Sequence, residues 1–164
     1  MTPSAYNAIC AAAIKSSSAI ATSCTTKWGM GCLVQDGENP ADPLSLADCP
    51  WICCLVWPTA ELGAIVDANS CEIVLTAGVG PLPSVEAPAL PTIGTERTPS
   101  TNGIRTYGNA ADAEGLLLLA IEAAKAACPN GAIVAASRIE TDNWMHYPLQ
   151  IASAVLTIRE YNTL

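Results

Sequence analysis

The sequence has no phenylalanine and few charged side chains. Charged residues make up 13% of its 164 positions, against about 25% in an ordinary soluble domain. A surface with so few charges favours burial against other subunits, with a compact alanine-rich monomer as the alternative. The length suits a single domain, residues 1–164, that has a core of its own.

Positive charge is also scarce, which argues against two classes of partner. The seven lysine and arginine residues are scattered singly, and the net charge is −8. Direct binding to a nucleic-acid backbone uses clustered basic residues, and an acidic chain is not attracted to an anionic membrane surface. No apolar run reaches the roughly 20 residues that span a bilayer. The sequence therefore predicts neither direct DNA binding nor a membrane partner.

The parts of a conventional active site are missing as well. The one histidine, His146, stands in the segment WMHY with no identifiable nucleophile beside it. The stretch GVGPLP lacks both the lysine and the following helix of a phosphate-binding loop, and the cysteines form no Cys-x-x-Cys motif. We therefore expect a protein that is not an enzyme and that carries no cofactor and no metal.

The spacing of apolar residues predicts an α+β domain. Thr2 and Pro3 are typical of a helix start, and we expect one helix from there to about Ser16–Ser18, followed by a loop over residues 27–50. A second helix is expected over DAEGLLLLAIEAAKAAC, from Asp112 to the stop at Pro129. Strands are expected at residues 51–57, 62–66, 71–77, 132–139 and 151–161. The expected fold is an antiparallel or mixed β-sheet with the two main helices packed on one face.

A long segment rich in proline and glycine, at about residues 78–109, interrupts this pattern. It contains GPLPSVEAPALPTIGTERTPSTNG and is too polar for core structure. Loops of this length inside a small domain are often functional, so we expect a partner-binding arm, with an irregular surface loop as the alternative. The candidate partner-binding residues are Leu82, Pro83, Pro91, Arg97, Arg105 and Tyr107.

The segment DCPWICCLVWP places three of the eight cysteines together. In a strand, Cys53 and Cys54 point to opposite faces and do not readily bind one ion, and structural zinc needs four ligands, commonly in two close pairs. Cysteine is also among the most frequently buried residues. We therefore interpret residues 51–57 as a strand that is buried on both faces. Cys24 and Cys32, in or beside the polar loop, are the candidate disulfide, within or between subunits.

The order of elements resembles that of the tail-terminator, or tail-completion, proteins of tailed bacteriophages. An N-terminal helix is followed by a loop and by an apolar strand that ends at a proline, CPWICCLVWP. An arm then precedes a helix that begins with acidic residues, DAEGLLLLAIEAAKAAC. The last segment is a hairpin that ends in a long alternating strand, NWMHYPLQIASAVLTIREYNTL. The resemblance covers most of the chain and lies in element order.

The resemblance implies a structural protein of the virion, assembled in the host cytoplasm. Its expected form is a homo-oligomeric ring, a hexamer, that caps the tail tube and joins it to the neck or connector below the capsid. Its expected partners are itself, the tail-tube protein and the neck proteins, with DNA only passing through the lumen. Three alternatives remain open: another neck or tail-tube subunit, a small cysteine-dependent redox enzyme, and a disulfide-stabilised binding module.

Overall fold

A computed structural model describes residues 2–56, 70–80, 96–101, 104–107, 110–128, 132–142 and 149–160. The predicted strand at 62–66 lies outside these ranges, as do His146 and the arm residues Leu82, Pro83 and Pro91. Among the described residues, no helix is both long enough and apolar enough to cross a membrane.

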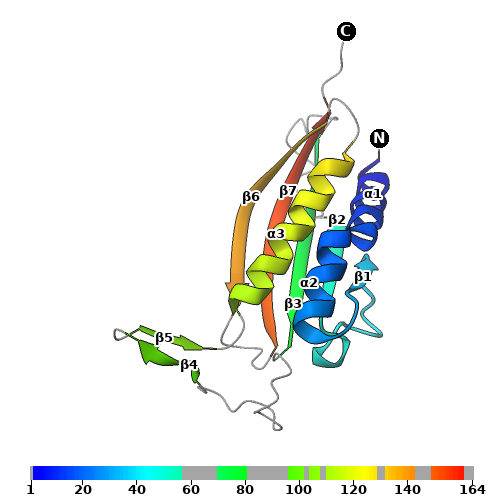
Figure 1. The fold of residues 1–164 in the computed structure, drawn as a ribbon. Coiled ribbons are helices and arrows are strands. Elements are labelled where there is room, and N and C mark those ends of the chain that lie inside the picture. The colour runs from blue at the N-terminus through cyan, green and yellow to red at the C-terminus, as the bar shows by residue number, and fades with distance from the viewer. Residues whose placement is uncertain are drawn as a thin grey trace.

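A five-stranded mixed sheet forms one layer of the fold (Figure 1). Its strand order is β1-β2-β3-β7-β6, in which β1 pairs with β2 in parallel and the other pairs are antiparallel. The strands are β1 (Leu33–Asp36), β2 (Trp51–Val56), β3 (Ser70–Val79), β6 (Ala132–Asp142) and β7 (Gln150–Glu160). The predicted α+β class is confirmed.

Three helices form the second layer and cover one face of this sheet (Figure 1). They are α1 (Pro3–Ser16), α2 (Ser18–Trp28) and α3 (Ala110–Ala127). The Thr2 side chain caps α1 as predicted. The prediction missed α2. Ser17 ends α1, and its side chain accepts a hydrogen bond from the Ile20 N–H, so the same residue also caps the start of α2. Gly29, with a φ of 73°, then ends α2 in the left-handed conformation that glycine favours.

The core lies between the helices and the sheet. The predicted alternation of β7 is confirmed, because its residues at even positions, from Ala152 to Ile158, are buried. The same alternation in β3 buries its residues at odd positions, Ile73 and Leu75 among them. From α3 the core receives Leu116, Leu117 and Ile121, and from α1 it receives Tyr6, Cys10 and Ile14.

The expected loop over residues 27–50 contains a strand and a short helix. β1 pairs with β2 in the register Val34↔Ile52, and a 3-10 helix, Leu46–Asp48, begins at Ser45 with a capping box. The prediction of an uninterrupted loop was wrong here. A four-residue edge strand has too little apolar periodicity to be read from sequence, and its pairing with β2 is a tertiary contact.

The segment expected to be an arm, at about residues 78–109, also contains regular structure. β3 extends to Val79, and β4 (Glu96–Thr101) pairs with β5 (Ile104–Tyr107) in a separate two-stranded sheet. In Figure 1 this hairpin lies away from the main sheet. The residues between the two strands are Asn-Gly, which is the strongest short hairpin signal in a sequence. The interpretation from composition alone overlooked that signal.

One close approach in the sheet generates a prediction about stability. Gly78 of β3 pairs with Trp51 of β2, and a Cβ atom at Gly78 would lie 2.2 Å from two atoms of the indole ring. The substitution Gly78→Ala must therefore displace a side chain that is only 4% exposed. We expect Gly78→Ala to lower the free energy of unfolding by about 1–3 kcal/mol, as measured by denaturant titration.

The matched control is Gly115→Ala in α3, where an added Cβ atom meets nothing within 4 Å. Glycine in a helix costs roughly 0.5–1 kcal/mol relative to alanine, so this change should leave stability equal or raise it. Equal losses of stability for the two variants would show that contact with Trp51 is not the reason why position 78 needs glycine.

Candidate functional site

The face of the sheet opposite the helices carries a row of half-buried apolar side chains. Leu55, Val74 and Val155 lie side by side on three adjacent strands, through the pairs Leu55↔Val74 and Val74↔Val155. A polar row lies next to it, in which the Thr76 and Ser153 hydroxyl groups are 3.1 Å apart. We call this the outer sheet face and define it by the residues Cys53, Leu55, Val74, Thr76, Ile151, Ser153 and Val155. An apolar row thus lies beside a polar row on this face.

This surface corrects the interpretation of residues 51–57 as a strand buried on both faces. Ile52 and Cys54 are fully buried beneath the helices, whereas Cys53 and Leu55 on the other side are only half-buried. The apolar run in the sequence resembles that of a doubly covered strand. Within the described residues, however, α1, α2 and α3 cover one side of β2 (Figure 1), and on the other side Trp51 is buried beside Ser45 while Cys53 and Leu55 are not.

A shallow pocket lies at one end of the outer sheet face. It has a volume of about 250 Å³ and includes Trp51, Cys53, Val74, Gln35 and Glu38 in its lining. This is smaller than a typical small-molecule site of about 300–1,000 Å³. The Trp51 indole N–H is already used, because it donates to the Ser45 carbonyl oxygen at 3.1 Å. The pocket is therefore better suited to an inserted side chain than to a whole ligand.

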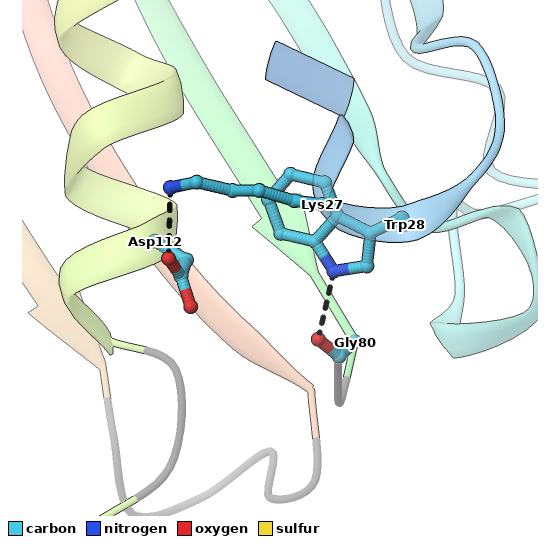
Figure 2. Close-up of polar contacts among 4 residues, drawn as sticks. All are labelled: Lys27, Trp28, Gly80 and Asp112. Atoms are coloured by element: carbon cyan, nitrogen blue, oxygen red, sulfur yellow. Dashed lines mark hydrogen bonds and ion pairs between the residues drawn. The ribbon is translucent and has the colours of Figure 1, made fainter. Parts of the chain in front are cut away.

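Two consecutive residues at the end of α2 hold both ends of the arm (Figure 2). The Lys27 ammonium group lies 2.9 Å from the Asp112 carboxylate in the first turn of α3. The Trp28 indole N–H donates to the Gly80 carbonyl oxygen at 3.3 Å. Gly80 follows β3 and Asp112 lies near the start of α3, so these contacts fix the points where the arm leaves and rejoins the domain. We call these two contacts the arm clasp.

The candidate arm residues lie in different places. Arg97 is in β4, and Arg105 and Tyr107 are in β5. The structure thus places these three in one hairpin, where β4 and β5 are paired by the register Glu96↔Tyr107. Sequence analysis did not identify the arm clasp, because a lysine and a tryptophan at a helix end carry no distinctive motif.

The candidate disulfide residues, Cys24 and Cys32, do meet in the structure. They lie close enough for each thiol to shift the pKa of the other, although no disulfide bond joins any of the eight cysteines, all of which lie in the described ranges. Cys24 was expected in or beside a loop; it lies instead in α2, and its side chain is fully buried. The disulfide itself stays a prediction.

The Cys24–Cys32 contact gives the two thiols different acidities. The neighbouring Cys32 thiol lowers the pKa of Cys24, and the nearby Lys27 charge lowers it further, against the effect of burial. The neighbouring Cys24 thiol raises the pKa of Cys32, as does burial. Of the two thiols, Cys24 is thus the one that loses its proton more readily, and the thiolate is the form that attacks a disulfide.

The thiols near the outer sheet face are poorly suited to nucleophilic chemistry. Burial raises the pKa of Cys53, and the Glu38 and Asp36 carboxylates raise it further. Burial, with the Asp48 charge, raises the pKa of Cys49 to about 12. Both thiols are therefore protonated at neutral pH, the less nucleophilic form. In the part of the chain that the structure describes, no group of three potential ligands is placed to hold a metal ion.

Comparison with known proteins adds no further assignment. The sequence matches no protein-family model and no curated protein. The structural features that bear on function are the outer sheet face and the arm clasp.

The proximity of Cys24 and Cys32 predicts a disulfide under oxidising conditions. After incubation with oxidised glutathione and acid quenching, peptide mapping should find these two residues linked. The bond would close a short loop and stabilise the fold by roughly 2–3 kcal/mol in the chain-entropy model, measured as the difference between oxidised and reduced protein.

Cys32→Ser should abolish this linkage, whereas Cys53→Ser on the outer sheet face should preserve it. If all eight thiols of the oxidised wild-type protein still react with an alkylating reagent after denaturation without reductant, no disulfide has formed. Cys24 would then serve packing only.

Proposed function

We propose that this chain is a structural subunit of a tailed-bacteriophage virion. In this proposal it forms a tail-terminator ring that caps the tail tube and joins it to the neck or connector below the capsid. The outer sheet face is the observation that carries the proposal. Its apolar row, Leu55, Val74 and Val155, is half-buried within the subunit and can be covered by a neighbouring copy.

The occupant of the outer sheet face in this proposal is a second copy of the chain. Burying apolar side chains yields about 25 cal/mol per Å² of surface removed from water. Covering the exposed part of this half-buried row would therefore stabilise the contact between two copies. If the copy contacts this face with a different part of its own surface, the contact is head-to-tail, and such contacts close into rings. The low charged fraction of the chain, 13%, supports extensive contact between copies.

Net charge supports a ring through which DNA passes without binding. The chain carries 15 acidic and seven basic residues. Like charge on the ring and on the DNA backbone disfavours attachment, and specific DNA binding would need a basic patch. DNA is therefore a passing cargo in this proposal, and the protein carries out no catalysis.

The arm provides the contact with the neighbouring virion protein. The arm clasp fixes both of its ends against α2 (Figure 2), and its β4–β5 hairpin lies away from the main sheet (Figure 1). A segment anchored at both ends loses less entropy on binding than a free one does. The order of helices and strands that carried the resemblance also supports this family of virion proteins.

Val74→Glu tests the outer sheet face. Val74 lies in the central strand β3 with its side chain half-buried, so the new carboxylate can reach water in the monomer but not in the assembly. We expect a folded protein with unchanged circular dichroism and at least a tenfold loss of assembly. Native mass spectrometry and electron microscopy would check this against the hexameric ring expected of the wild-type chain.

The control variant is Leu118→Glu on α3, whose side chain is 52% exposed on the helical layer. It adds the same charge away from the outer sheet face and should leave assembly intact. Equal assembly of the wild type and Val74→Glu would remove this face from the interface, and a wild-type monomer at high concentration would reject the ring altogether.

Shortening the arm tests its separate role. Replacing residues 82–107 by a glycine-serine linker should preserve the fold, because the arm clasp and the main sheet use none of those residues. Helical content and thermal midpoint should stay close to those of the intact chain, while binding to tail-tube or neck protein in a pull-down should be lost. Unchanged binding would show that the arm is only a surface loop.

A further inference from the structure

We propose that the pocket at the end of the outer sheet face receives an arginine side chain from the β4–β5 hairpin of a neighbouring copy. The inference rests on the proposed function, because it names the segment with which one copy of the chain holds the next. The hairpin is only one part of the arm, so the rest of the arm remains for the contact with tail-tube or neck protein. The chemistry of the pocket lining identifies the kind of side chain that fits.

The pocket has walls that suit a long apolar stem. Its lining includes five apolar residues, which come from β2, from β3 and from the segment that precedes β2: Pro43, Leu44, Trp51, Leu55 and Val74. The stems of lysine and arginine lie along apolar surface while their charged ends stay in contact with polar groups. A pocket of about 250 Å³ with such walls can therefore accept one of these side chains, provided that its polar groups match the charged end.

The polar groups of the lining favour a ligand that donates hydrogen bonds. The Trp51 indole N–H, an amide N–H of Gln35 and the Cys53 thiol each donate to a backbone carbonyl oxygen of the same chain. The Thr76 hydroxyl group lies 3.1 Å from that of Ser153 on the next strand. Because these groups already have partners, the lining offers a ligand mainly acceptors, among them the amide oxygen of Gln35.

The charge at the pocket is negative. Glu38 belongs to its lining and is exposed, and residues 28–95, which include every lining residue, contain no lysine, arginine or histidine. A carboxylate and a guanidinium group can form two parallel hydrogen bonds, and the planar guanidinium group also stacks on aromatic rings. An exposed ion pair contributes little alone, so the stem in the pocket and the ion pair at Glu38 must act together. An arginine side chain supplies both.

The β4–β5 hairpin carries two arginines. Arg97 is in β4 and Arg105 is in β5, and no other basic residue stands between Lys27 and Lys125. Among the described strands, β4 and β5 pair only with each other and lie outside the main sheet (Figure 1). Two arginines against one glutamate give residues 96–107 a net positive charge in a chain that is acidic as a whole. The charge of the hairpin is therefore complementary to that of the pocket.

The hairpin and the pocket lie at the same end of the main sheet and at opposite edges of it (Figure 1). Gln35 and Trp51 place the pocket at the edge formed by β1 and β2, near the end of β3, because Trp51 pairs with Gly78. The hairpin lies on the side of β6, the strand at the other edge. Neighbouring strands are about 4.8 Å apart, so the sheet is roughly 19 Å wide from β1 to β6. A projection at one edge and a receiving pocket at the other fit a head-to-tail contact, which repeats from copy to copy.

Charge variants on each side of the contact test the inference in the full-length chain. Arg97→Gln combined with Arg105→Gln removes the positive charges of the hairpin, and Glu38→Lys repels them at the pocket. Each variant should keep the circular dichroism of the wild-type chain and lose assembly by about tenfold or more, as measured by native mass spectrometry over a concentration series. Lys15→Gln and Asp42→Asn are the matched controls, because both side chains are exposed and neither belongs to the pocket or the hairpin. Both controls should assemble as the wild-type chain does.

Mixing the two defective variants tests the head-to-tail direction. The double arginine variant retains an intact pocket and Glu38→Lys retains an intact hairpin, so one working contact can form between them. We expect heterodimers and no ring. Undiminished assembly of both variants, or a mixture that gives no heterodimer, overturns the inference, whereas the proposed ring stands as long as the wild-type chain assembles. A wild-type monomer at high concentration rejects both. The variants alter different segments, so the misfolding of one leaves the other to decide.

Discussion

The burial of one face of the sheet is the constraint on which the rest of the structure depends. Alternate residues of β2, β3 and β7 lie beneath α1, α2 and α3, so their neighbours in each strand point the other way. Leu55, Val74 and Val155 are therefore brought into one row by the same register that builds the core. The outer sheet face is a direct consequence of how the core is formed.

Polar contacts fix the helical layer at its two ends. At one end, the buried Asn7 side chain donates to the Asp36 carboxylate and, at 3.0 Å, to the Cys54 carbonyl oxygen, which joins α1 to β1 and β2. At the other end, Lys27 and Trp28 form the arm clasp (Figure 2). Because each contact joins elements distant in sequence, together they fix where the helices sit on the sheet. The arm ends are positioned by the same contacts.

The cysteines have different roles according to their surroundings. Cys54 is fully buried beneath the helices and serves packing, and burial is the first cause that raises its pKa. Cys53, the next residue, lies on the outer sheet face because neighbouring strand residues alternate. Cys24 and Cys32 are neighbours, and each thiol shifts the pKa of the other. One residue type thus provides packing, surface and potential cross-links in a single small domain.

Local pattern determined much of the fold and little of the candidate site. Thr2 as a helix cap, α3 and the alternation of β7 could be predicted, because capping and periodicity depend on residues a few positions apart. Tertiary structure alone decided that β1 joins β2, that α1, α2 and α3 cover one side of β2, and that Cys24 lies near Cys32. Those outcomes depend on contacts between distant segments, which are stabilised only when the whole core forms and leave no periodic signal in the sequence.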